Sequence, residues 1–266
     1  MIFELFQYSF ISRGLVAGLI MAVVAPLIGV FLVLKRYSLI ADTLSHVSLA
    51  GIAFGLLFGI HPTLTALIAT VITALGLEGL RQKRLYSESA LAIFLSGSLA
   101  LAVVIFGLAR GFNANLLGYL FGSILTVSQS DLWLMAGSSL IILSAVIIFF
   151  KELVAVTFDE EAARVAGLPV RLVNNIFIVV AALAVSMAIP VVGALLIAAL
   201  IVIPAVSALQ LRRNLFWTII YAEIFSVLAV ISGIILSFYF DLAAGGTIVL
   251  VMLLIFALVA SWSSKK

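Results

Sequence analysis

The sequence predicts an all-α, multi-pass membrane protein, and three observations support this fold class. Of the 266 residues, 65% are hydrophobic and only 9% are charged, whereas a soluble domain of this size carries about 25% charged residues. Several runs without any charged residue reach about 20 residues, which is the length that crosses a hydrocarbon core of about 30 Å. Cysteine is absent, so neither a disulfide framework nor a thiolate metal site is available.

We expect a single transmembrane domain over 1–266, with eight or nine spanning helices. Uncharged runs cover 14–34, 89–109, 132–150 and 242–264, and a longer one covers 172–211. At about 1.5 Å per residue the longest run suffices for two crossings. The predicted helices lie at 13–34, 38–60, 62–80, 88–109, 131–150, 171–189, 193–211, 214–239 and 245–262.

Two segments differ from ordinary spans. The stretch 113–127 is apolar but short and contains Gly118 and Gly122, so we expect a re-entrant or half helix there. The first apolar segment has no basic leader and no small-residue cleavage site, so it is expected to be a retained helix and not a signal peptide.

The basic residues orient the chain in the membrane. With the N-terminus outside, 12 of the 14 basic residues face the cytoplasm, as the positive-inside rule requires. These are Lys35, Arg36, Arg81, Lys83, Arg84, Lys151, Arg164, Arg171, Arg212, Arg213, Lys265 and Lys266. The net charge is only +3 and no long basic face tracks phosphates, so we exclude nucleic-acid binding.

The first chemically informative motif is ADTLSHVSLAG at 41–51, on the cytoplasmic side of the second helix. Asp42 and His46 are four residues apart and therefore share one helical face. A carboxylate oxygen and an imidazole nitrogen suit zinc or manganese, and ionisable groups within membranes usually face a pathway. The alternative is a polar pair at the interface, with His46 hydrogen-bonded to a neighbouring helix.

The second motif is the cytoplasmic loop TFDEEAARVAGLP at 157–169. Thr157 or Asp159 can cap a short helix whose first turn is acidic, and Gly167 can supply its C-terminal turn before Pro169 starts the next span. Such a helix would offer apolar side chains to a partner protein. The alternative is that the segment is only a solvated connector between two spanning helices. The apolar side chains are Phe158, Val165 and Leu168.

The third region is the Pro/Gly break between the spans at 171–189 and 193–211. Pro190 and Gly193 mark the break, and Pro204 lies inside the later helix, where proline frees backbone groups and bends the helix. This pattern suits a helix that lines a moving pathway, although a merely bent structural helix fits as well. Glu223 lies roughly 13 Å into its own helix and His46 roughly 12 Å into the second, so Glu223 is a further pathway candidate.

These motifs together resemble the permease subunit of the zinc/manganese family of ATP-binding-cassette importers, over nearly the whole chain. The resemblance implies a metal-coordinating role for Asp42 and His46. It also implies that the cytoplasmic helix docks on a separate ATPase. The positions that it assigns to this docking are Phe158, Asp159, Glu160, Glu161, Ala162, Ala163, Arg164, Gly167 and Leu168.

The resemblance also implies the setting of the protein. We expect a homodimer in a bacterial cell membrane, a cytoplasmic ATPase, an external metal-binding protein and no permanently bound cofactor. The transported ion is expected to be Zn²⁺, since HVSLAG resembles the zinc branch of the family, with Mn²⁺ next and iron left open. The last external loop, DLAAGG at 241–246, lacks the two prolines that are common in the family.

Two other transporter classes compete with this interpretation. In a proton-driven secondary transporter, Asp42, His46 and Glu223 would form a relay. A siderophore or vitamin importer permease would usually be longer and would have no evident use for a metal pair. The chain has no GxxxxGK[ST] motif, so it is expected to be a transporter subunit and not an ATP-hydrolysing enzyme.

Overall fold

The computed structural model describes residues 9–83, 87–108, 118–122 and 127–263. Its helices are α2 (Ser9–Leu34), α3 (Leu39–Phe58), α4 (Pro62–Gln82), α5 (Ser87–Leu108), α7 (Gln129–Ile148), α8 (Phe150–Phe158), α9 (Glu160–Val165), α10 (Val170–Val192), α11 (Ile197–Leu209), α12 (Leu215–Phe240) and α13 (Ala244–Ser263). Within these residues, eight helices are long and apolar enough to cross a membrane, and α11 is a shorter apolar helix. The predicted all-α, multi-pass class is confirmed.

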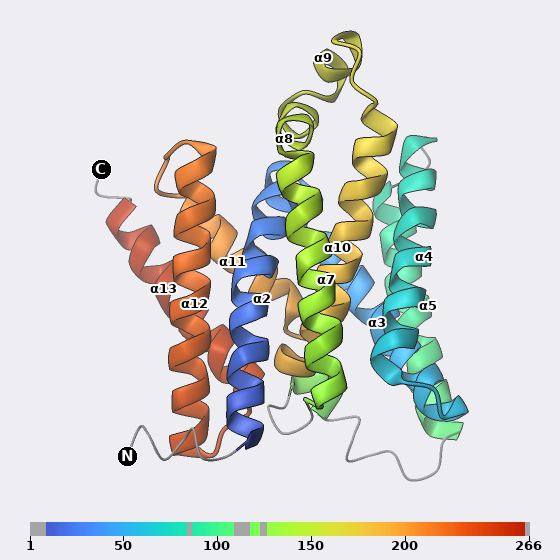
Figure 1. Cartoon of the computed structure of the whole chain (residues 1–266), viewed down its shortest axis with the longest axis vertical. Coiled ribbons are helices and arrows are strands. Elements are labelled where there is room, and N and C mark those ends of the chain that lie inside the picture. Colours follow the sequence, from blue (N-terminus) through green and yellow to red (C-terminus); the bar gives the residue numbers. More distant parts are fainter. Residues whose placement is uncertain (1–8, 84–86, 109–117, 123–126, 264–266) are drawn as a thin grey trace.

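The described helices form one bundle in which they run between two ends of the molecule (Figure 1). The described chain begins at one end, with Ser9, and finishes at the opposite end, with Ser263. The chain therefore crosses between the two ends an odd number of times. Helix α11 and the residues before it count as one of these crossings, because together they return the chain to the end that carries α8 and α9. This arrangement agrees with termini on opposite sides of the membrane.

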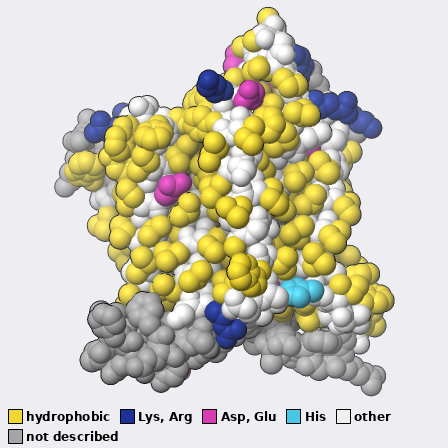
Figure 2. Space-filling model, viewed as in Figure 1, with side chains coloured by type: hydrophobic (Ala, Val, Ile, Leu, Met, Phe, Trp, Pro, Cys, Tyr) yellow, Lys and Arg dark blue, Asp and Glu magenta, His cyan; other side chains and the backbone are white. Residues whose placement is uncertain are grey.

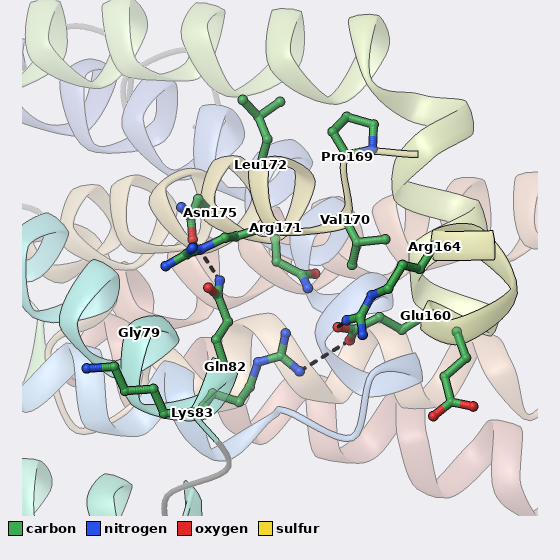
Figure 3. A pocket seen from close by; sticks show the side chains of 13 residues that line it. Gly79, Gln82, Lys83, Glu160, Arg164, Pro169, Val170, Arg171, Leu172 and Asn175 are labelled. Atoms are coloured by element: carbon green, nitrogen blue, oxygen red, sulfur yellow. Dashed lines mark hydrogen bonds and ion pairs between the residues drawn. The ribbon is translucent and has the colours of Figure 1, made fainter. Parts of the chain in front are cut away.

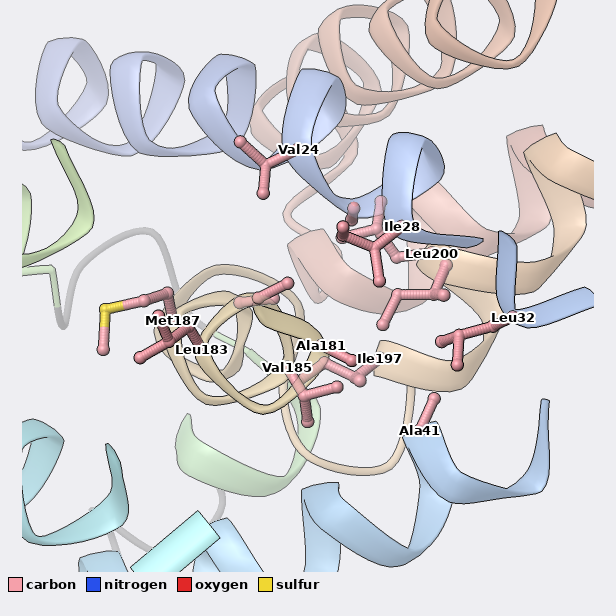
Figure 4. Packing of buried hydrophobic residues seen from close by; sticks show 14 of the residues in the cluster. Val24, Ile28, Leu32, Ala41, Ala181, Leu183, Val185, Met187, Ile197 and Leu200 are labelled. Carbon is pink, nitrogen blue, oxygen red and sulfur yellow. The ribbon is translucent and has the colours of Figure 1, made fainter. Parts of the chain in front are cut away.

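The core of the bundle is built around α10. This helix packs against α2, α3, α4 and α7, and its apolar side chains are almost wholly buried. Figure 4 shows Ala181 and Val185 of α10 near side chains of α2 and α11, including Ile28 and Leu200. An element that is apolar all round belongs inside such a bundle, because it has no polar face to expose.

The outer surface carries many exposed hydrophobic side chains. Figure 2 shows hydrophobic side chains across the middle of the molecule, and Lys, Arg, Asp and Glu mainly at the end that carries α9. Large exposed hydrophobic residues occur on α5, α7, α12 and α13, for example Val104, Ile147, Leu228 and Leu254. Such a surface is stable in contact with lipid tails and not with water.

The connection between α10 and α11 differs from the predicted tight Pro/Gly break. Pro190 lies inside the last turn of α10, and the helix ends at Gly193. The predicted helix at 193–211 begins only at Ile197, so its 13 residues rise roughly 20 Å, short of a full crossing. Irregular backbone at membrane depth is tolerated where protein surrounds it, and the residues from Val191 to Ala194 are fully buried.

Three glycines meet at this break. Gly193 has φ +87°, and a Cβ there would lie 2.3 Å from the backbone N of Gly122. A Cβ at Gly245 would lie 2.2 Å from the carbonyl O of Val192. Backbone hydrogen bonds from Ala194 N to Tyr119 O (2.8 Å) and from Leu195 N to Leu120 O (3.2 Å) join the break to the described end of the predicted half helix. We call Gly122, Gly193 and Gly245 the glycine junction.

The described part of the predicted half helix is short. Gly118 to Phe121 form a single helical turn, and Gly122 follows with φ +76°. The remainder of 113–127 lies largely outside the described residues. The turn and the left-handed glycine are what a half helix ending inside the protein requires.

The α3–α4 hairpin is packed unusually closely. Gly51 and Gly55 face α4, and a Cβ at Gly51 would lie 2.7 Å from the Cα of Ala66. At Gly55 it would approach Thr65 Oγ1 at 2.3 Å. Small residues four apart let helix backbones approach within a membrane, where dispersion contacts provide most of the attraction. The hairpin is thus expected to move as one body.

Candidate functional site

Asp42 and His46 lie on one face of α3, as their spacing predicts. The His46 Nε2 atom is 3.8 Å from Asp42 Oδ1. The imidazole is buried, whereas the Asp42 side chain is 38% exposed. The other ring nitrogen, His46 Nδ1, is buried and has no hydrogen-bond partner among the residues that the structure describes. This ring therefore offers an unused nitrogen, and the alternative of a histidine hydrogen-bonded to a neighbouring helix finds no support here.

The polar neighbours of the pair are engaged elsewhere. Ser45 Oγ donates to the carbonyl O of Asp42 at 2.7 Å, and Ser48 Oγ donates to Ser186 Oγ of α10 at 3.3 Å. Both serines therefore stabilise the helix and its packing. The described residues contain no group of three or more His, Cys, Asp or Glu side chains that could hold a metal ion.

Two protein ligands suit passage of a metal ion better than permanent retention. Structural zinc sites hold four protein ligands, whereas Asp42 and His46 would offer only one oxygen and one nitrogen. The remaining positions would be filled by water or by groups outside the described residues. A weakly coordinated ion can leave, which transport requires.

The cytoplasmic loop forms two helices and not the single capped helix that its pattern predicts. Asp159 is the N-cap of α9, and its Oδ1 accepts hydrogen bonds from the backbone N–H groups of Glu161 (3.0 Å) and Ala162 (2.9 Å). Phe158 belongs to α8, which follows α7 directly after Phe149. Thr157 lies inside α8 and caps nothing, because the Asp159 carboxylate already holds those N–H groups.

Of the remaining predictions for this loop, the glycine turn and the exposure of Phe158 and Val165 are found in the structure, whereas the expected exposure of Leu168 is not. Gly167 has φ +82° and provides the C-terminal turn, which only glycine adopts without strain. Phe158 and Val165 are exposed, with Val165 at 90%, whereas Leu168 is only partly exposed and packs on the core. Ala163 is buried. An exposed apolar pair on the cytoplasmic helices is available to a partner.

Ion pairs connect α9 to the cytoplasmic end of α4. Arg81 forms two hydrogen bonds with the buried carboxylate of Glu78, at 2.8 Å and 2.9 Å. Its third nitrogen, Nη1, contacts Glu160 Oε2 of α9 at 3.5 Å. Arg164 contacts the other oxygen of Glu160 at 3.4 Å. Glu160 thus lies between an arginine of the transmembrane bundle and one of its own helix.

A second set of contacts connects α10 with α2 and α4. Lys35 Nζ donates to Asn174 Oδ1 at 2.6 Å and lies 5.1 Å from the centre of the Phe177 ring. Burial, and then the neighbouring Arg81, lower the pKa of Lys35 to about 8. Gln82 Nε2 donates to Asn175 Oδ1 at 3.2 Å. The cytoplasmic ends of these helices are therefore held together by polar contacts.

These elements enclose a cytoplasmic groove with a volume of about 1030 Å³. Figure 3 shows its lining from α4, α9 and α10, with Gln82, Glu160 and Asn175 pointing into it. Four of its lining side chains are basic, namely Arg81, Lys83, Arg164 and Arg171. A groove of this size beside the exposed Phe158 and Val165 provides a docking surface with both apolar and charged contacts.

The structure links the cytoplasmic helix to Asp42 and His46 through a continuous set of contacts. Glu160 of α9 contacts Arg81 of α4, and α4 packs on α3 through Gly51 and Gly55. Asp42 and His46 lie on that same α3. These contacts form a contiguous route between α9 and the pair.

The other predicted pathway residues are dispersed. Pro190 and Gly193 lie at the buried end of α10, and Pro204 lies inside α11. Glu223 is half-buried on α12, and no hydrogen bond or ion pair joins it to another described residue. Helix α11 packs against both α3 and α12, so it lies between Glu223 and His46. The structure does not bring Glu223 and the Asp42–His46 pair together.

Sequence reasoning missed Arg81 and Glu78 as functional candidates, treating Arg81 only as a topology signal. The signal was present, because Glu78 and Arg81 are three residues apart at the end of an apolar helix and share one face. The close approach at Gly51 and Gly55 also has a sequence signature, a G-x-x-x-G motif in a membrane helix.

Comparison with known proteins gives concordant results. The ABC 3 transport family matches residues 7–263. The manganese transport system membrane protein MntC of Halalkalibacterium halodurans is 32% identical and covers 99% of this chain and 90% of its own. The high-affinity zinc uptake system membrane protein ZnuB of Haemophilus influenzae is 31% identical and covers 95% of this chain and 97% of its own.

A solved structure has the same fold. PsaBC from Streptococcus pneumoniae, determined in complex with an Fab, superposes with a TM-score of 0.87 at 29% identity. The superposition covers 97% of this chain and 95% of that chain. The match therefore includes α11 and the cytoplasmic helices as well as the long spans.

Proposed function

Because the chain belongs to the ABC 3 transport family, we propose that it forms the translocation pathway of an ATP-driven zinc importer, with manganese as the second candidate ion. The coarser function is shown by the relatives: the chain is a multi-pass permease subunit of a bacterial metal importer of the ATP-binding-cassette class, and not itself an enzyme. The choice of ion, the site residues and the subunit arrangement are our proposal.

The Asp42–His46 pair is the single observation that carries the proposal. His46 Nε2, which lies 3.8 Å from Asp42 Oδ1, and the partly exposed Asp42 carboxylate are nitrogen and oxygen donors of the kind that zinc and manganese accept. The HVSLAG sequence at 46–51 resembles the zinc branch of the family, which favours zinc. The relatives include both a manganese and a zinc system.

The mechanism that we propose uses three separate partners. An external metal-binding protein delivers the ion, a second copy of the chain completes the pathway, and a cytoplasmic ATPase supplies the energy. The ATPase would dock on α9, on the exposed Phe158 and Val165, and on the groove beside them. Nucleotide binding would move α9, and Glu160 and Arg81 would pass this motion to the α3–α4 hairpin.

Uptake by proteoliposomes containing the chain and its ATPase tests this function. We expect entry of labelled zinc to require both ATP and the ATPase, and to exceed entry of manganese by at least about tenfold, or about 1.4 kcal/mol of discrimination. If manganese entered as fast as zinc or faster, zinc would be excluded as the preferred ion. The assignment as a metal importer would be unaffected. Entry driven by a proton gradient without ATP would instead favour a secondary transporter.

The Glu160–Arg81 contact gives a prediction about coupling. Glu160→Gln keeps the side chain's size but removes the charge that Arg81 contacts, so we expect the number of metal ions moved per ATP to fall up to about fivefold. This follows because such a partly exposed pair contributes up to about 1 kcal/mol. Transport and ATP hydrolysis measured in the same proteoliposomes give the ratio.

Glu152→Gln is the control for this variant. Glu152 lies on α8, does not line the groove, and its side chain makes no ion pair within the described residues. Its ratio of transport to hydrolysis should stay at the wild-type value. A normal ratio in Glu160→Gln, with the ATPase still bound, would show that the contact carries no coupling.

A further inference from the structure

A second cavity lies at the cytoplasmic end of the bundle, away from the metal pair and from α9. Its volume is about 490 Å³, within the range of about 300–1,000 Å³ of small-molecule sites. It is formed by the turn between α11 and α12 and by facing surfaces of α12 and α13. Its lining residues are Gln210, Leu211, Arg212, Arg213, Tyr221, Phe225, Val259, Trp262 and Ser263.

The rim of this cavity is positively charged. Arg212 and Arg213 are exposed, and within the described part of the chain neither guanidinium has an ion-pair or hydrogen-bond partner. Arg212 has φ +53°, a left-handed conformation that is unfavourable for a residue with a Cβ. The two arginines are adjacent in one tight turn, and a guanidinium pair of this kind suits a phosphodiester.

The wall of the cavity becomes apolar with depth. Tyr221 and Phe225 lie one turn apart on α12, with their rings 6.3 Å apart and inclined by only 25°. Val259 and Trp262 face them from α13, and Trp262 is 56% exposed. Tryptophan and tyrosine favour the interface between headgroups and acyl chains. From the rim inward, the cavity thus presents arginine side chains, then aromatic rings, and then an apolar wall.

One hydrogen bond closes the cytoplasmic edge of the cavity. Ser263 Oγ donates to the carbonyl O of Gln210 at 2.8 Å, which ties the end of α13 to the turn before α12. The two arginines are therefore held beside Trp262 and are not on a separate loop. This contact gives the cavity a fixed rim.

We propose that this cavity binds an anionic phospholipid of the cytoplasmic leaflet. The phosphodiester contacts Arg212 and Arg213, the glycerol region lies beside Tyr221 and Trp262, and one acyl chain follows Phe225 and Val259. Basic pockets between transmembrane helices on the cytoplasmic side bind such headgroups, and the anionic leaflet supplies them at high local concentration. A lipid fits the apolar wall, which a free phosphate ion would leave unused.

Native mass spectrometry of the purified chain tests the site. With equal amounts of phosphatidylglycerol and phosphatidylcholine added, we expect preferential retention of phosphatidylglycerol in the wild type. In the variant R212G/R213Q the bound phosphatidylglycerol should fall at least about fivefold. Glycine at position 212 tolerates the left-handed backbone, so the variant should fold.

Arg36→Gly is the matched control. Arg36 is also an exposed arginine with a left-handed backbone, at φ 55°, in a turn that precedes a helix. It does not line this cavity, so its replacement should leave the bound lipid unchanged. Equal losses in both variants, or no loss in R212G/R213Q, would overturn the proposal.

Tryptophan fluorescence locates the lipid independently of retention. In the variant W133F/W217F, Trp262 is the only tryptophan of the chain, and lipids with brominated acyl chains quench rings that they contact. We expect stronger quenching by brominated phosphatidylglycerol than by brominated phosphatidylcholine, and no difference once R212G/R213Q is added. Equal quenching by the two lipids would contradict the proposal.

Two additional measurements separate other occupants. If millimolar inorganic phosphate abolished the preference for phosphatidylglycerol, the site would be one for a free anion and the proposal would be wrong. If addition of the ATPase displaced the lipid, the cavity would belong to a protein interface, and the proposal would be equally wrong. Neither result depends on zinc transport, so the outcome is distinct from a failure of the proposed function.

Discussion

Replacing Asp42 or His46 by alanine is expected to reduce metal uptake on the order of 100-fold. These side chains supply the one carboxylate and the one imidazole of the proposed passage site, and they lie 3.8 Å apart. Loss of a group that merely supports a metal ligand already costs about 10–100-fold in metal affinity or activity. Loss of one of only two ligands should reach at least the upper end of that range.

The same experiment separates a metal role from a structural one. Asp42→Asn retains the size of the side chain and removes its charge, so uptake should fall nearly as far as in Asp42→Ala. Surface expression and ATP hydrolysis by the bound ATPase should remain, because the half-exposed carboxylate makes no interhelical contact within the described residues.

Ser48→Ala provides the matched control on the same helix. Ser48 lies half a turn beyond His46, and its 3.3 Å hydrogen bond to Ser186 contributes at most about 1 kcal/mol. Uptake in this variant should stay close to the wild-type rate. If both Asp42→Ala and His46→Ala accumulated metal at the wild-type level, the pair would not be part of the translocation pathway.

Gly193→Ala is expected to destabilise the folded protein strongly. At φ +87° and ψ 152°, the backbone of Gly193 lies in a region that is nearly restricted to glycine, at a cost of about 1–3 kcal/mol for other residues. The added Cβ would lie 2.3 Å from Gly122 N and 2.4 Å from Leu120 O. Backbone atoms cannot yield as a side chain does, so a further cost of about 1–3 kcal/mol is expected.

Together these costs, about 2–6 kcal/mol, correspond to a fall in Tm of roughly 4–24 °C, since about 1 kcal/mol shifts the Tm of a chain of this size by about 2–4 °C. Thermal unfolding of the detergent-solubilised protein, followed by size-exclusion chromatography, measures this shift. Gly246→Ala is the control, because Gly246 adjoins the junction but its Cβ would meet no atom within 4 Å. Equal Tm values for the two variants would refute the close packing at the glycine junction.

The sequence was sufficient for those features that depend on local composition. The predicted spans at 13–34, 62–80 and 245–262 agree with α2, α4 and α13 to within a few residues. This agreement arises because the bilayer sets both the length and the hydropathy of a spanning helix. The shared face of Asp42 and His46 was likewise predictable, since four residues make about one helical turn.

Features that depend on contacts between distant segments were not predictable. The start of α11 at Ile197 results from the hydrogen bonds of Ala194 and Leu195 to Tyr119 and Leu120, which hydropathy cannot reveal. The separation of α8 from α9 results from Asp159. Its role as an N-cap could be recognised from the sequence, whereas the preceding helix α8 could not. The expected proximity of Glu223 to His46 is not found for a related reason. Depth in a helix does not specify the direction in which a side chain faces.

The glycine junction also has a consequence for the biogenesis of the protein. Its three glycines, at positions 122, 193 and 245, come from segments that leave the ribosome far apart in time. The backbone hydrogen bonds between 119–120 and 194–195 can form once α10 has been inserted, but Gly245 contacts Val192 and Phe121 only after the last hairpin has been synthesised. Assembly of the irregular backbone at membrane depth is therefore completed only after the start of α13 has been synthesised, and chains truncated before α13 should lack the packing of Gly245 on Val192 and Phe121.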